Sequence, residues 1–159
     1  MHRRENWGKP MEETLRAVRD YLEKHKDIYL VFPMHLNPLV RDTAHRVLDG
    51  FERKILIEPL EYLEFIAIMD GAHYIMTDSG GVQEEAPSLG KPTLVLRDTT
   101  ERPEAIEAGT AKLTGTKYEE VIKDMELLEG ETYEKMSKAN NPYGDGKTSK
   151  RIRKYLETI

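Results

Sequence analysis

Short apolar runs alternate with amphipathic stretches along almost the whole chain, and this alternation limits the fold more than any other feature. Residues 11–25 place their apolar side chains on one helical stripe with charged residues around it. The continuous apolar run at residues 28–32 is typical of a strand that is covered on both faces. Strands separated by helices of this length predict a parallel sheet with right-handed crossovers.

The alternation continues to the end of the chain and predicts a single α/β domain over residues 1–159, with a Rossmann-like, doubly wound sheet. Further strands are expected at residues 54–57, 73–77, 92–96 and 111–113. Further helices are expected at residues 38–48, 62–69, 82–89, 103–108, 117–128, 131–139 and 147–158. A loop rich in turn formers at residues 140–146 precedes the last helix, so that helix could pack apart from the body.

The amino-terminal segment has the character of a loop between a strand and a helix, but no strand-like run precedes it. In a doubly wound sheet the first strand lies centrally, between the second and the fourth. We therefore expect the sheet to lack its first strand and to have a gap in its middle. The strands at residues 28–32 and 73–77 should then close the gap directly or borrow a strand from a neighbour.

Composition removes several classes of function. The net charge of -5 argues against general nucleic-acid binding, which needs a basic surface. The chain has no cysteine, which excludes disulfides, thiolate metal sites and thiol nucleophiles. No apolar run approaches the roughly 20 residues of a membrane span, and the amino terminus lacks the apolar core of a signal peptide. We expect a cytoplasmic protein without nucleic-acid or membrane partners.

The stretch TDSGGVQEEAP follows an expected strand and opens a helix. Gly80 and Gly81 let the backbone approach a ligand closely, and free amides with the helix dipole favour an anion. Ser79 adds a hydroxyl donor, and Glu85 could accept hydrogen bonds from ribose hydroxyls. The alternative is a tight turn in which Asp78 or Ser79 only caps the helix.

The stretch RDTTERPE follows the next expected strand, so it should lie beside the serine-glycine loop. Its two arginines and two threonines could clamp a diphosphate. The alternative is a solvated loop in which Arg97 and Arg102 pair with Asp98, Glu101 or Glu104. Together with the loops near residues 2 and 35, these segments predict a nucleotide site in one crevice.

Histidines and aromatic residues add weaker signals. His2 begins a cationic cluster with Arg3 and could act as acid, base or phosphate contact, although a bare terminus is often frayed. His35 follows a strand at the same edge, and Phe65 could form a wall for a base or simply be core. The other histidines show no metal-ligand spacing, so no metal site is expected: His25, His45 and His73.

Several of these motifs are long and, taken in order, resemble one family. They are HRREN, MHLNP, EPL with the following aromatic residues, TDSGGVQEEAP, RDTTERPE and NPYGDG. From residue 1 to about 155 the chain resembles the C-terminal half of the non-hydrolysing UDP-N-acetylglucosamine 2-epimerases.

The resemblance implies the C-terminal, UDP-binding domain of a glycosyltransferase B type fold. It implies UDP and UDP-N-acetylhexosamine as ligands, no cofactor, and a place in cell-wall polysaccharide biosynthesis; a homodimer is left open. By position in the family, Phe65 would meet the uracil, Glu85 the ribose, and Ser79, Gly80 and Gly81 the diphosphate. Arg102 and His2 would lie at the phosphate and sugar end, with His2 in a catalytic role. Arg3 and His35 would belong to a regulatory site for a second UDP-sugar.

The family reaction inverts C2 by eliminating UDP and adding it back to the opposite face. The resemblance places the proton-transferring carboxylates in an N-terminal domain, and Glu58, Glu84 and Glu101 match none of them. We therefore expect a half-enzyme, cut free of that domain and inactive unless another chain supplies it. The alternative is a stand-alone, non-catalytic UDP-sugar binding module. A general glycosyltransferase is disfavoured because it would lack the HRREN and ERPE segments.

Overall fold

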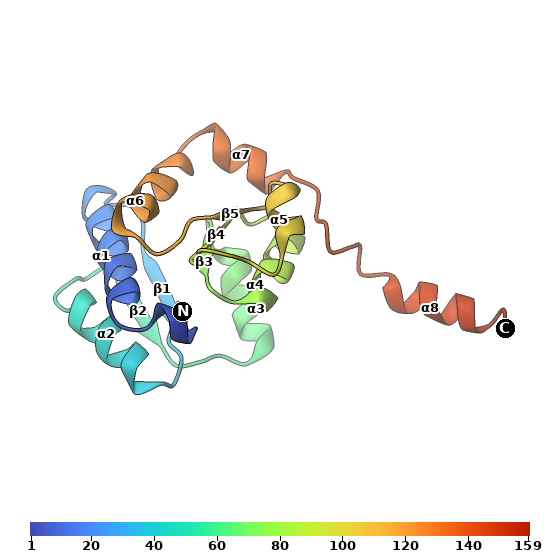
Figure 1. Cartoon of the computed structure of the whole chain (residues 1–159), viewed down its shortest axis with the longest axis horizontal. Helices are drawn as coiled ribbons and strands as arrows, with labels where there is room; N and C mark the ends of the chain where they lie inside the picture. The colour runs from blue at the N-terminus through green and yellow to red at the C-terminus, as the bar shows by residue number, and fades with distance from the viewer.

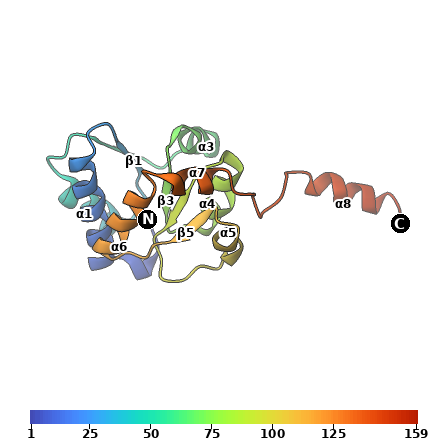
Figure 2. The same ribbon diagram turned by 90° about the horizontal axis from the view of Figure 1, so that it is seen from above.

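The computed structural model describes residues 1–159 and shows five parallel strands with helices on both sides (Figures 1 and 2). The strands are β1 (Leu30–Pro33), β2 (Lys54–Ile57), β3 (Ile75–Thr77), β4 (Thr93–Val95) and β5 (Ala111–Leu113). The α-helices are α1 (Lys9–Lys24), α2 (Pro38–Leu48), α3 (Tyr62–Gly71), α4 (Gly80–Glu85), α5 (Pro103–Glu107), α6 (Tyr118–Leu127), α7 (Glu131–Ser137) and α8 (Thr148–Leu156). Two short 3-10 helices are η1 (Arg4–Asn6) and η2 (Ala86–Leu89).

The helices form two layers, one on each face of the sheet. Alternate residues of the central strand β4 point to opposite faces and pack against different layers. Leu94 packs into a core cluster with Val18 of α1 and Val121 of α6. The next residue, Val95, packs against Ala105 of α5 on the other side. This alternation is the period of two of a strand that is buried on both faces. The fold is the doubly wound α/β domain that the sequence predicts.

The sheet is divided into two parts. β1 pairs with β2, and β3, β4 and β5 pair in that order, all in parallel. Read across the molecule, this is the doubly wound order with no strand between β1 and β3. The expected gap is therefore present, and the first of the two expected outcomes, direct pairing of β1 with β3, does not occur. A groove separates them instead.

Strand boundaries differ from the expected ones for a reason visible in the ladder. β1 extends through Pro33, which was expected to end it. The N–H groups of Leu30 and Met34 donate to the carbonyls of Arg53 and Ile57 on the β2 side. The backbone groups of the odd-numbered residues between them, Val31 and Pro33, therefore face away from β2. Pro33 lacks an N–H, and at this position the ladder needs none. β1 begins at Leu30 rather than at residue 28 because the first hydrogen bond between the two strands runs from the Leu30 N–H to the Arg53 carbonyl.

Local signals explain where several helices begin and end. The Asn37 side chain accepts a hydrogen bond from the Leu39 N–H at 2.9 Å, which caps α2. The helix expected at residues 82–89 becomes α4 followed by the 3-10 turn η2, because Pro87 cannot donate to a continuing α-helix. Gly90 then ends the segment with a φ of 64°, a left-handed conformation that favours glycine.

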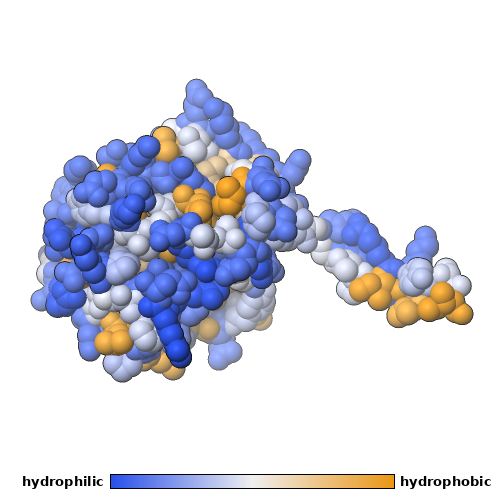
Figure 3. Space-filling model, viewed as in Figure 1, coloured by the Kyte–Doolittle hydropathy of each residue, from blue (hydrophilic) through white to orange (hydrophobic).

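α8 stands apart from the two layers. It has no buried residue, and Figures 1 and 2 show it projecting from the body on an extended linker. Figure 3 shows orange along one face of this segment, and the exposed large hydrophobic residues of α8 are Ile152, Tyr155 and Leu156. No helix of the structure is both long and apolar enough to cross a membrane.

Removing residues 147–159 should leave the stability of the body unchanged, because α8 contributes no buried side chain to it. We expect the free energy of unfolding to change by less than about 0.5 kcal/mol, as for surface changes in general. Urea unfolding followed by circular dichroism measures this. Truncation at residue 130 is the control, because it also removes the buried Met136 and should destabilise by about 1 kcal/mol or more. A large loss on removing α8 alone would contradict its isolation.

Candidate functional site

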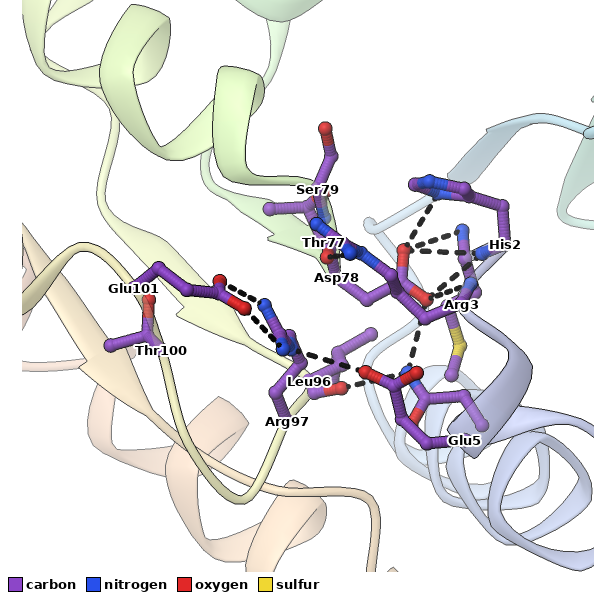
Figure 4. A network of polar contacts seen from close by, with 12 residues as sticks. His2, Arg3, Glu5, Thr77, Asp78, Ser79, Leu96, Arg97, Thr100 and Glu101 are labelled. Atoms are coloured by element: carbon purple, nitrogen blue, oxygen red, sulfur yellow. Dashed lines mark hydrogen bonds and ion pairs between the residues drawn. The ribbon is translucent and has the colours of Figure 1, made fainter.

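The carboxylate of Asp78 ties the amino-terminal loop to the end of β3 (Figure 4). The backbone N–H groups of His2 and Arg3 each donate to Oδ2 at 2.9 Å. The Asn6 amide donates to the same oxygen at 3.0 Å and to the Leu96 carbonyl at 3.0 Å. One buried carboxylate therefore joins the HRREN loop to the ends of two strands, β3 and β4.

The Asp78 side chain is fully buried, yet its carboxyl group is held in the ionised form. Burial alone would raise its pKa, but the Met1 amino group and the N–H donors of Arg3, His2 and Asn6 outweigh burial and hold the pKa below the usual range. His2 adds its ring, whose Nδ1 lies 3.2 Å from Oδ1. The position of His2 at the site thus depends on Asp78.

The serine-glycine turn lies directly beyond this anchor. The Ser79 N–H donates to Thr77 Oγ1 at 3.0 Å, and Ser79 occupies the N-cap position of α4. Its side chain makes no capping hydrogen bond, so the hydroxyl is not committed to the helix. The expected cap role therefore does not account for Ser79. Its hydroxyl remains available to a ligand.

A relay of polar groups connects this turn to the next loop. Gln83 is fully buried, and its Nε2 donates to the Ser79 carbonyl at 3.1 Å. Its Oε1 accepts from the Thr100 hydroxyl at 2.7 Å, and Thr100 Oγ1 accepts from the Arg102 N–H at 3.1 Å. Arg102 is thereby held over the turn, where its Cζ lies 3.8 Å from the place that a Cβ on Gly80 would occupy.

The two arginines of the RDTTERPE loop differ in their roles. Arg97 is buried and pairs with Glu101, at 2.9 Å between Nη2 and Oε1, and with Glu5 at 3.4 Å. The hydrogen bond from Arg97 lowers the pKa of Glu101 to about 2. Arg97 is thus structural, as the alternative interpretation had it. Arg102 pairs with Glu84, a partner that the sequence interpretation did not name.

A second polar cavity lies on the other side of the HRREN loop. Its volume is about 500 Å³. The His2 and His35 rings stack across it with centroids 5.7 Å apart. Its lining is polar and carries two arginines: His2, Arg3, Arg4, Glu5, Trp7, His35 and Asn37. The structure thus brings His2, Arg3 and His35 together, in a setting that favours an anion.

Phe65 and Glu85 occupy the other side of the turn. Phe65 is half-buried on α3 and packs against the small cluster around Met69, Ile75 and Ala86. Glu85 is half-buried at the end of α4 and makes no side-chain hydrogen bond or ion pair. Both residues lie on elements that flank the serine-glycine turn, and Glu85 keeps its acceptor oxygens uncommitted.

Sequence reasoning missed three residues that build the site. Asp78 was considered only as a helix cap, and neither Asn6 nor Gln83 was considered as a structural link. A signal existed for Asp78, because an acid directly after a buried strand has no water to solvate it and needs several donors. Its donors lie 72 to 76 residues away, a separation that no local pattern reports.

None of the three acids that could act as a base is free in the structure. Glu58 pairs with Arg41, Glu84 with Arg102, and Glu101 with Arg97. The hydrogen bond from Arg41 lowers the pKa of Glu58, and Arg97 does the same for Glu101. A low pKa makes a weak base near neutral pH. No cluster of three or more His, Asp or Glu side chains could hold a metal ion.

Replacing Asp78 with asparagine should loosen the HRREN loop, because one amide oxygen cannot accept all the donors and the new NH₂ faces that of Asn6. We expect a loss of about 1–3 kcal/mol of stability at neutral pH. The carboxylate has a depressed pKa in the folded state, so its contribution is lost as pH falls through that value. Urea unfolding from neutral to acidic pH should show the variant and the wild type converging in acid. A constant difference would contradict the role of the charge.

Known proteins are similar to this chain along nearly its whole length. A family model described as UDP-N-acetylglucosamine 2-epimerase matches residues 1–157. The UDP-N-acetylglucosamine 2-epimerase of Bacillus subtilis is 54% identical over 153 residues, which cover 95% of this chain and 40% of that protein. The chain therefore spans well under half the length of this relative.

Solved structures agree with the sequence matches. The Staphylococcus aureus MnaA–UDP structure superposes with a TM-score of 0.93 at 49% identity, covering 99% of this chain and 45% of that chain. The Neisseria meningitidis UDP-GlcNAc 2-epimerase bound to UDP-GlcNAc superposes with a TM-score of 0.92 at 48% identity, covering 99% and 43%. Fold, motifs and matched length agree, and the chain belongs to the UDP-N-acetylglucosamine 2-epimerase family as its C-terminal portion.

Proposed function

We propose that this chain is the UDP-binding half of a UDP-N-acetylglucosamine 2-epimerase. The observation that carries the proposal is the convergence of His2, the Ser79 turn and Arg102 at one edge of the sheet. The Asp78 anchor and the Gln83 relay hold these groups in place. The S. aureus relative, at 49% identity, was solved with UDP.

In this proposal the diphosphate lies at the turn. The Ser79 hydroxyl and the backbone at Gly80 and Gly81 donate to it, and the Arg102 guanidinium covers its other side. Glu85 accepts hydrogen bonds from the ribose hydroxyls, because its carboxylate has no other partner. Phe65, half-buried on α3, meets the uracil in this proposal.

The chemistry assigned to this half is the stabilisation of UDP as it leaves and returns. Elimination of UDP across C1 and C2 breaks the bond to the diphosphate oxygen, and charge develops on that oxygen. Arg102 and His2 are the groups that can stabilise it. The proton on C2 needs a base, and Glu58, Glu84 and Glu101 are committed to arginines. We infer that an N-terminal domain supplies the base and that turnover requires it.

The second polar cavity suits a regulatory role in the same proposal. Arg3 and His35 line it beside His2, so an anionic ligand there would contact the residue that also serves the UDP site. A ligand bound in one site would change the contacts of His2 in the other site. We assign this cavity to a second UDP-sugar, with Arg3 and His35 as its ligands.

Calorimetric titration with UDP, UMP and uridine tests the proposed site. Affinity should rise with the number of phosphates, because the turn and Arg102 act on the diphosphate. Ser79→Ala should weaken UDP binding by about tenfold, the loss of roughly one charge-assisted hydrogen bond. Glu85→Gln should weaken UDP, UMP and uridine alike, because all three carry the ribose.

Matched substitutions on exposed positions serve as controls. Ser149→Ala lies on α8 and Glu107→Gln at the end of α5, both outside the proposed site. Neither should change the affinity for UDP. Equal affinity for UDP and uridine in a folded chain would overturn the assignment of the turn to the diphosphate.

The ion pair between Glu84 and Arg102 leads to a separate prediction. Glu84 competes with a diphosphate for the same guanidinium, and its own charge repels the ligand. Glu84→Gln should therefore tighten UDP binding, by roughly two- to fivefold for a partly exposed ion pair. It should leave uridine binding unchanged. Weaker UDP binding by Glu84→Gln would contradict the proposed role of Arg102.

A further inference from the structure

The loop at residues 140–146 is fastened to the body of the domain. The Asn141 side chain donates to the Ser88 hydroxyl at 2.9 Å and accepts from the Tyr143 N–H at 2.9 Å. The half-buried Tyr143 ring packs against the core cluster around Val95. A loop that only connected the body to α8 would not need these contacts. The docking of Tyr143 therefore points to a further role.

The Tyr143 hydroxyl is buried and makes no hydrogen bond. Nearly all buried polar atoms in folded proteins are paired, because they have lost their hydrogen bonds to water. A phenylalanine would pack in the same space without leaving a polar group unpaired. Packing alone therefore does not account for a tyrosine at this position. The hydroxyl is accounted for if its neighbours have a second arrangement that gives it an acceptor.

The charged groups around Tyr143 come from α4 and from the start of α5. They are Glu84, Arg102 and Glu104. Tyr143 packs on α5 through Ala105, and Asn141 ties the loop to η2, which directly follows α4. Burial raises the pKa of the Tyr143 phenol, so near neutral pH the hydroxyl keeps its proton and can donate it. A donor without an acceptor thus lies near two carboxylates.

Glu84 is the carboxylate whose partner changes when a diphosphate occupies the proposed UDP site. In the structure its Oε1 accepts from Arg102 Nε. Arg102 Nη1 donates to the Glu101 carbonyl at 3.1 Å, and Nη2 lies over the turn at Gly80. A diphosphate at the turn attracts the guanidinium and repels Glu84, because both are anions. Glu84 then leaves Arg102 and needs another donor.

We propose that Tyr143 is a positioning residue for Arg102: its hydroxyl donates to the Glu84 carboxylate when Arg102 turns to the diphosphate. This role rests on the proposed function of the chain as a UDP-binding half. The exchange gives the buried hydroxyl the acceptor that it lacks and gives Glu84 a donor in place of the guanidinium. Tyr143 does not touch UDP and acts only through Glu84 and Arg102. Its effect is therefore confined to ligands that carry the diphosphate.

Tyr143→Phe keeps the ring and removes only the hydroxyl. The melting temperature of the full chain without UDP should stay the same or rise, because the lost hydroxyl has no partner to leave behind. Calorimetric titration should show UDP binding weakened by about three- to tenfold, the loss of roughly one hydrogen bond to a carboxylate. Uridine binding should not change, because uridine carries no phosphate.

A double-mutant cycle separates this role from a general effect on the loop. Glu84→Ala removes the acceptor, so adding Tyr143→Phe to it should change UDP affinity by less than about twofold. Glu104→Ala is the matched control, because Glu104 is also an acid near Tyr143 but is exposed and forms no ion pair with Arg102. In that background Tyr143→Phe should keep its full effect.

A spectroscopic signal reports the exchange directly. In the full chain labelled with 13C at tyrosine Cζ, the Tyr143 signal is identified by its loss in Tyr143→Phe. It should shift when UDP is added, because the hydroxyl gains an acceptor, and it should not shift with uridine. In Glu84→Ala the shift with UDP should disappear.

The outcomes distinguish a failure of the proposed function from a failure of this role. No UDP binding by the folded wild-type chain would overturn both. UDP binding that Tyr143→Phe leaves unchanged, or weakens equally with Glu84→Ala present, would overturn the role of Tyr143 alone. A lower melting temperature of Tyr143→Phe without UDP would also count against it, because the hydroxyl would then already be paired.

Discussion

The buried carboxylate of Asp78 holds together parts of the chain that are otherwise far apart. It gathers the N–H groups of His2 and Arg3 and the amide of Asn6 around one residue at the end of β3. A buried charge is unfavourable unless donors surround it, so the HRREN loop and the strand end stabilise each other. The orientation of His2 depends on this anchor, and His2 lines both the proposed UDP site and the second cavity.

The ends and the middle of the sheet have opposite character. At the carboxyl ends of the strands, polar loops converge, and Arg97 and Arg102 are paired with glutamates. Between β1 and β3 the walls are apolar and the unmet groups belong to the backbone. A small anionic ligand suits the first region.

The sequence predicts the order of the elements and most of the candidate site, because both follow from local patterns. The apolar runs locate all five strands, and the serine-glycine and arginine-threonine loops lie side by side as expected. Features that depend on distant residues are not predicted. The pairing of Arg102 with Glu84 spans 18 residues, and the donors to Asp78 are farther away still. The end of β1 at Pro33 depends on which edge of the strand is paired, which only the sheet reveals.

We propose that the Asp78 anchor and the Gln83 relay form a UDP site within this chain alone. A titration with UDP followed by 15N–1H correlation spectra tests it most directly. We expect the largest shifts at the amides of Gly80 and Gly81 and at the side-chain N–H of Arg102, with a smaller response at His2. A well-dispersed spectrum in which UDP shifts none of these signals, or shifts signals elsewhere, would contradict it.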